Sequence, residues 1–106
     1  MSYYPLTIQK MDEDTEEWTD LLHLHALSVN QAQSFGWGDR ESYEAGAERF
    51  RPRLKFEMRW CKALEDAAYV PQLHRIIYKG RTYNIQGYDD FMEQNRTVRL
   101  IGEAYG

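Results

Sequence analysis

The sequence holds one cysteine and no long apolar run, and each shortage excludes a class of protein. Because Cys61 has no partner within the chain, no internal disulfide framework can form, and we expect a reducing compartment. No apolar run approaches the ~20 residues that a membrane-spanning helix needs, so we expect no membrane partner. The first ten residues have neither a basic start nor an apolar stretch, and we expect no secretory signal peptide.

What is present indicates a folded globular chain. Hydrophobic residues make up 42% and aromatic residues 14% of the 106 residues, well outside the range of disordered proteins. A chain of this length forms one domain, which we assign to residues 1–106, and it buries roughly two-thirds of its unfolded surface. The sequence shows no internal repeat and no low-complexity tract.

The net charge of −4 conceals an uneven distribution. Residues 1–48 carry ten acids and two bases (−8), whereas residues 49–106 carry eleven bases and seven acids (+4). The acids gather at Asp12, Glu13, Asp14, Glu16, Glu17 and Asp20, and the bases at Arg49, Arg51, Arg53, Lys55, Arg59 and Lys62. Two faces of opposite sign either dock onto oppositely charged neighbours, including copies of the same chain, or are solvated surface.

Alternation of apolar and polar residues predicts β-strands along most of the chain. Residues 54–62 give the clearest case, because Phe56 and Met58 point one way while Lys55 and Arg59 point the other. By the same alternation Cys61 faces the polar side, and the tryptophans Trp18 and Trp60 are expected in the core. Strands are predicted over residues 4–10, 18–31, 54–62, 75–78, 81–85 and 97–105.

The stretch HRIIYKGRTYNIQGYDD, residues 74–90, raises the question of whether Lys79-Gly80 binds a ligand. A phosphate-binding loop needs several glycines leading into a helix, but a strand follows Gly80. Glycine also supplies the positive φ of a tight hairpin, either in a two-residue loop or in a turn with a bulge. We therefore predict a β-turn.

Two other segments complete the prediction. Residues 39–50, DRESYEAGAERF, favour a short helix, because Asp39 can cap it and Tyr43, Ala47 and Phe50 share one face. Residues 64–73 are predicted to form a loop with one helical turn. The fold class is then mainly β: a small antiparallel barrel or sandwich of five or six strands, with one short α-helix and long loops.

No set of residues forms a recognisable catalytic, metal or cofactor site. His23 and His25 share one strand face, but nothing near them in sequence completes a metal site, and ordinary strand histidines are the simpler interpretation. Cations near Cys61 favour a thiolate, yet a lone thiol without a positioned base is usually structural. We predict no catalytic residue, no metal, no cofactor and no enzymatic activity.

Partner contacts are the remaining candidates for function. Trp37, between two glycines, is either an interface anchor or folds back on its own core. The basic run suits contact with a neighbouring subunit or with a partner protein, and one hypothesis pairs it with the acidic segment 12–20 of a neighbouring copy. The candidate interface residues are Trp37, Arg49, Arg51, Arg53, Lys55, Arg59, Asp12, Glu13 and Asp14.

The ordered series of segments resembles a known family. The segments are LTIQK, an acidic gap, WTD, HALSVN, ESYEAGAERF, RPRLKFEMRW, LHRIIYKGRTYNIQGYDD and TVRLIGEAY, from about Leu6 to Tyr105. Together they are similar to the head–tail joining proteins of long-tailed bacteriophages, also called head-closure, stopper or head–tail adaptor proteins.

The resemblance implies a structural virion protein that forms a ring at the head–tail junction. The ring would close the portal channel after DNA packaging, touch the packaged DNA end and present a surface to the tail. The implied partners are the portal or adaptor ring, which is the second candidate contact of the basic run, and a tail-completion or tail-tube protein. The implied location is the virion, after a stage in the host cytoplasm.

A second function of another class stays open. Small barrels also bind single-stranded nucleic acid, and the basic run could contact phosphates. Against this, Phe56 and Trp60 alternate with the cations and so point inward, away from a base-stacking surface.

Overall fold

The computed structural model describes residues 4–32, 52–90 and 93–105. Within them, one α-helix, α2 (Lys62–Ala68), is followed by a short 3-10 helix (Pro71–Leu73). The strands are β1 (Tyr4–Met11), β2 (Trp18–Ala26), β3 (Ser28–Gln31), β4 (Arg53–Arg59), β5 (His74–Tyr78), β6 (Arg81–Asp90) and β7 (Thr97–Ala104). No helix of the described ranges is long and apolar enough to cross a membrane.

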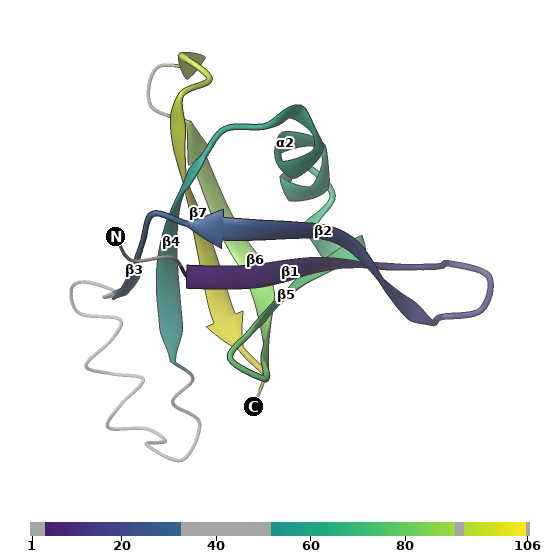
Figure 1. The fold of residues 1–106 in the computed structure, drawn as a ribbon. Coiled ribbons are helices and arrows are strands. Elements are labelled where there is room, and N and C mark those ends of the chain that lie inside the picture. Colours follow the sequence, from purple (N-terminus) through teal and green to yellow (C-terminus); the bar gives the residue numbers. More distant parts are fainter. Residues whose placement is uncertain (1–3, 33–51, 91–92, 106) are drawn as a thin grey trace, which may run out of the picture.

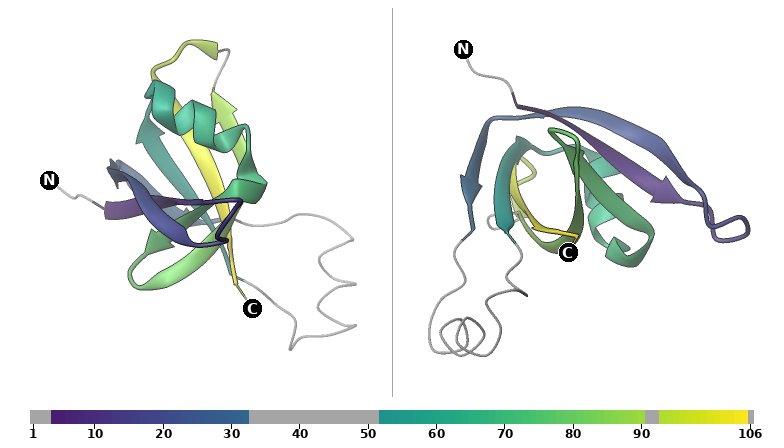
Figure 2. Two further views of the ribbon diagram at one scale, coloured as in Figure 1. Left: turned by 90° about the vertical axis from the view of Figure 1, so that its right-hand side faces the viewer. Right: turned by 90° about the horizontal axis from the view of Figure 1, so that it is seen from below.

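The strands form one antiparallel sheet with the order β2-β1-β5-β6-β7-β4-β3. The two outermost strands, β2 and β3, follow each other in the chain with only Leu27 between them. The sheet therefore curls until both of its edges meet at one bent segment (Figures 1 and 2). The backbone N–H of Leu27 fixes this bend by donating to the carbonyl of Glu57. The predicted small antiparallel β fold is confirmed.

The bend explains the number of strands. The predicted single strand over 18–31 divides at Leu27 into β2 and β3, so six predicted strands become seven. Residues 64–73, predicted as a loop with one turn, hold most of α2 and the 3-10 helix instead. The predicted helix over 39–50 lies outside the described residues.

The core lies inside the curl and is built from the alternating faces of the strands. Phe56 of β4 is fully buried, and the rings of Tyr78 and Tyr83 meet it edge to face at 5.3 and 6.1 Å. The β7 backbone approaches this cluster closely, since a Cβ at Gly102 would lie 3.0 Å from the Tyr83 Cβ. Helix α2 adds Leu64, which is also fully buried.

The Lys79-Gly80 turn has the predicted form. Tyr78 pairs with Arg81, so the loop is two residues long. Lys79 and Gly80 have φ values of 49° and 76°, and positive φ at both positions is the type I′ geometry that matches the twist of the strands.

Two predicted side-chain directions are wrong, and each has a local cause. Between β1 and β2 the register shifts, pairing Ile8 with Leu22 but Gln9 with Asp20. Leu21 is the extra residue of this bulge, and it reverses the alternation, so Trp18 lies on the outer face. In the other case β4 ends at Arg59, and Cys61, at the N-cap of α2, packs half-buried against the core rather than facing the polar side.

Candidate interaction surfaces

The predicted site residues fall into three groups. Asp12, Glu13 and Asp14 lie in the turn of the β1–β2 hairpin, whereas Arg53, Lys55 and Arg59 lie along β4. Figures 1 and 2 show this turn projecting from the molecule on the side away from β3 and β4. Trp37, Arg49 and Arg51 lie outside the described residues.

The β1–β2 turn is acidic and well formed. The Asp12 carboxylate accepts the backbone N–H of Asp14 at 2.8 Å, and the Asp12 carbonyl accepts that of Glu16 at 2.7 Å. Glu16 takes the left-handed conformation with φ of 60°. All residues from 12 to 17 are exposed. Four carboxylates have neither an ion pair nor a hydrogen bond with the described residues: Glu13, Asp14, Glu16 and Glu17.

An outer-face network braces the base of this hairpin. The Arg75 Nε–H donates to the Gln9 Oε1 at 2.8 Å, and the Gln9 amide donates to the Asp20 carboxylate at 2.9 Å. The Arg75 guanidinium lies 4.2 Å from the centre of the Trp18 ring. These contacts cross three neighbouring strands, β5, β1 and β2, and fix the direction in which the hairpin projects.

The two histidines of β2 are exposed on this outer face. His23 lies 3.2 Å from the Thr7 hydroxyl and 3.8 Å from the Asp20 carboxylate, and both imidazoles point away from the core. In the described part of the chain no group of three or more His, Cys, Asp or Glu side chains is placed to hold a metal ion.

The β4 cations are less uniform than the sequence indicates. Arg53 pairs with Glu103 at 3.0 Å, and on the same ladder Glu57 pairs with Arg99 at 3.7 Å. Lys62 pairs with Asp66 at 3.1 Å in α2, and this contact raises the pKa of Lys62. The β7 residues Arg99 and Glu103 lie more than forty residues beyond their β4 partners, so no local sequence pattern predicts these ion pairs.

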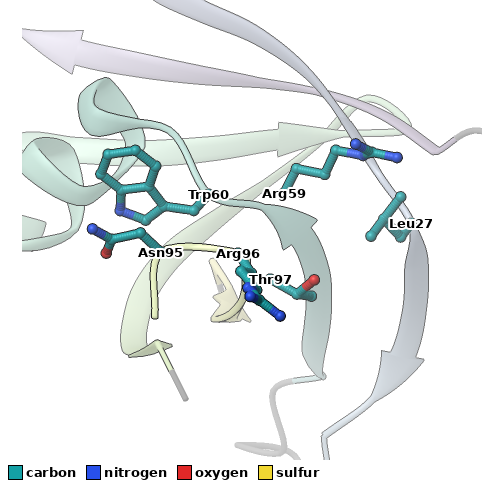
Figure 3. Close-up of a pocket in the computed structure, with 6 residues that line it drawn as sticks. All are labelled: Leu27, Arg59, Trp60, Asn95, Arg96 and Thr97. Carbon is teal, nitrogen blue, oxygen red and sulfur yellow. The ribbon is translucent and has the colours of Figure 1, made fainter. Parts of the chain in front are cut away.

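The end of β4 forms a basic pocket of about 530 Å³ (Figure 3). Its cations are Arg59 and Arg96, both exposed, and neither guanidinium has an ion pair or hydrogen bond among the described residues. The full lining is Leu27, Arg59, Trp60, Asn95, Arg96 and Thr97.

Sequence reasoning named Arg59 but missed Arg96 and Asn95. Arg59 pairs with Thr97 at the start of β7, and the backbone N–H of Trp60 donates to the backbone carbonyl of Arg96 at 2.7 Å. The two arginines therefore line the same pocket only because β7 lies beside β4. The order of the strands in the sheet was the missing signal.

The area between α2 and β6 contains the most perturbed titratable group. No described residue bonds the buried Tyr88 hydroxyl, and burial, followed by the Glu65 carboxylate, raises the pKa of Tyr88 above its ordinary value. Cys61 is a free thiol nearby. Tyr88 and Cys61 form no nucleophile–base pair with each other or with another described residue.

The fold and the surfaces together define a small antiparallel β domain with an acidic projection and a basic pocket on opposite sides. A family model for the phage head completion protein matches residues 7–104 of the chain. The chain belongs to this family, and it is therefore a structural protein of the phage head, located in the virion and in contact with other virion proteins. No curated protein matches the chain.

Proposed function

We propose that the chain assembles as a ring at the head–tail junction, where it closes the portal channel after packaging and offers the surface to which the tail attaches. The observation that carries this proposal is the family match over residues 7–104. Before assembly the protein would reside in the host cytoplasm, and its role in the virion would be non-enzymatic.

The charge distribution supports a role in assembly. The acids of the β1–β2 turn and the arginines near the end of β4 that have no ion pair with a described residue lie on different sides of the molecule. Complementary charges of this kind steer association and fix the orientation of partners more than they raise affinity. A subunit that must find one place in a larger shell needs this orientation.

The proposed partners are the portal or adaptor ring on the head side and a tail-completion or tail-tube protein on the tail side. The cations of β4 and those proposed just before it would meet acidic surfaces of these partners or of a neighbouring copy. The proposed contact residues are Arg49, Arg51, Arg53, Lys55 and Arg59, with Trp37 as an apolar anchor and Asp12, Glu13 and Asp14 on the acidic side.

Mixing the purified protein with its cognate portal ring tests this function. We expect a discrete complex with a fixed number of copies per ring, measured by light scattering at low and moderate salt. The variant Arg51→Glu/Arg53→Glu should weaken the complex, whereas Lys79→Glu/Arg81→Glu, with the same charge change at the β5–β6 turn, should not. The proposal would be refuted if no complex formed at low salt and none at moderate salt.

One observation favours the alternative, a single-stranded nucleic-acid module. The structure places the half-buried Trp60 ring in the same pocket as Arg59 and Arg96, which combines an aromatic face with two cations. This function predicts binding to single strands that weakens steeply as salt rises, and no complex with the portal ring.

A further inference from the structure

The basic pocket at the end of β4 has a charge opposite to that of one segment of this same chain. We infer that the acidic β1–β2 turn of one copy docks into the Arg59–Arg96 pocket of the next copy. The inference rests on the proposed ring and names the contact that joins its neighbouring subunits.

The pocket is preorganised to receive an anion. Its wall is formed by the β4–β7 ladder, in which Arg59 pairs with Thr97, and by the loop that precedes β7. Asn95, close to the start of β7, is held in place, since its backbone N–H donates to the Asp90 carboxylate at 3.2 Å. The two guanidiniums thus stand on a fixed backbone without a carboxylate partner in the described part of the chain. Other cations nearby, such as Arg53 and Lys62, already have one.

The acidic β1–β2 turn, which would enter this pocket, also has a defined conformation. Backbone and Asp12 hydrogen bonds shape the turn, so the carboxylates that no described residue pairs project from a defined loop rather than from a flexible tail. The Arg75–Gln9–Asp20 network stiffens the part of the β1–β2 hairpin that carries this turn. A stiff projection loses little conformational freedom when it docks, which favours binding.

The positions of the two surfaces determine the kind of assembly. The turn and the β3–β4 side lie at opposite ends of the view in Figure 1 and again in the right-hand view of Figure 2. A copy that offers its turn to one neighbour therefore keeps its pocket open for another. Such a head-to-tail contact generates a closed ring when its rotation closes, whereas an isologous contact would stop at a dimer.

Charge exchange between two variants tests the contact. The turn variant is Glu13→Lys/Glu17→Lys, and the pocket variant is Arg59→Glu/Arg96→Glu. Self-association of each is followed at low salt by sedimentation and by dilution of ¹⁵N-labelled protein in NMR spectra. We expect the wild type to associate, with shifts at both surfaces, and each variant alone to associate at least about tenfold more weakly. The pocket variant sets like charges opposite each other, and the turn variant reduces the net charge of residues 12–17 from −5 to −1. An equal mixture of the two variants should associate again.

The control variant Lys79→Glu/Arg81→Glu has the same net charge as the pocket variant, since two reversals change −4 to −8. It should associate like the wild type. Recovery in the mixture cannot arise from misfolded variants, because unfolding would remove association in the mixture as well.

Three results would overturn the inference: a wild type that stays monomeric at low salt, a pocket variant that associates like the control, or a mixture without recovery. Loss of single-strand binding in the pocket variant, without wild-type self-association, would assign the pocket to nucleic acid. If the pocket variant still forms a complete complex with the portal ring, the docking contact is wrong while the proposed function stands.

Discussion

The two hairpins of this domain, β1–β2 and β5–β6, differ in how their geometry is encoded. The β5–β6 hairpin turns in two residues, Lys79 and Gly80, and its register follows from the turn. The β1–β2 hairpin has a longer acidic turn and a bulge at Leu21, and its outer face is organised by Arg75 from a third strand. The comparison teaches that a short turn fixes a hairpin locally, whereas a bulged hairpin depends on its neighbours.

The largest expected effect tests whether the two hairpins share one core. Ile8 of β1 and Ile76 of β5 are cross-strand partners, and both are fully buried. Replacing either with alanine should lower the free energy of unfolding by about 2–5 kcal/mol, because each leaves a cavity in the same core. Urea unfolding measures the loss, and Leu21→Ala, at an exposed bulge position, is the control with little effect. A small loss for Ile8→Ala alone would mean that β1–β2 is a separate flap.

The second prediction breaks the tight hairpin at its turn. Nothing lies within 4 Å of a Cβ placed on Gly80, so Gly80→Ala adds only backbone strain from the positive φ. We expect a loss of about 1–2 kcal/mol in thermal or urea unfolding. Lys79→Asn is the matched control, since asparagine tolerates this conformation, and it should unfold no more easily than the wild type. Equal losses in both variants would contradict the type I′ assignment.

The third prediction loosens the bulged hairpin from outside. Arg75→Ala removes the hydrogen bond to Gln9 and the contact with the Trp18 ring, which together contribute about 1–2 kcal/mol. Solvent then reaches the ring, so the tryptophan emission should shift to longer wavelength. The same substitution in a Trp18→Phe background should leave the emission unchanged. A shift that persists there would assign the change to another tryptophan.

The smallest effect concerns the far half of β6, beyond the tight turn. Tyr88→Phe removes a buried hydroxyl that no described residue bonds, and we expect a gain of up to about 1 kcal/mol at neutral pH. Burial raises the pKa of Tyr88 above its ordinary value of 10.0, so above pH 10 the unfolded chain ionises first. Stability of the wild type therefore falls as the pH rises through this range, and Tyr88→Phe should lose less. Urea unfolding at neutral and alkaline pH measures both, with Tyr105→Phe, at an exposed tyrosine, as the control.

The strands and the tight turn could be predicted because their signals are local. Period-two alternation identified the β4 residues Phe56 and Met58 as core, and a single glycine between β-rich runs identified the β5–β6 turn. Local alternation fails where one residue is inserted, so the outward position of Trp18 could not be predicted without the register of β1 against β2.

The candidate site was only partly predictable for a related reason. Charge clustering marks the acidic turn and the basic run, but pairing across strands decides which cations stay unpaired. Arg53 forms an ion pair with Glu103, whereas Arg59 and Arg96 line one pocket, and both facts depend on the β4–β7 ladder. A single sequence does not reveal that ladder, because the two strands are separated by most of the second half of the chain.

The position of β7 in the sheet has a consequence for how the chain folds. Its residues, Thr97–Ala104, pair with β6 on one side and β4 on the other, although β7 follows all the other described strands in sequence. Until it emerges from the ribosome, the β2-β1-β5-β6 portion and the β4-β3 portion have no ladder between them among the described strands. The complete sheet can therefore form only after β7 has been synthesised, and the many long-range pairings that β7 completes are typical of slowly folding topologies.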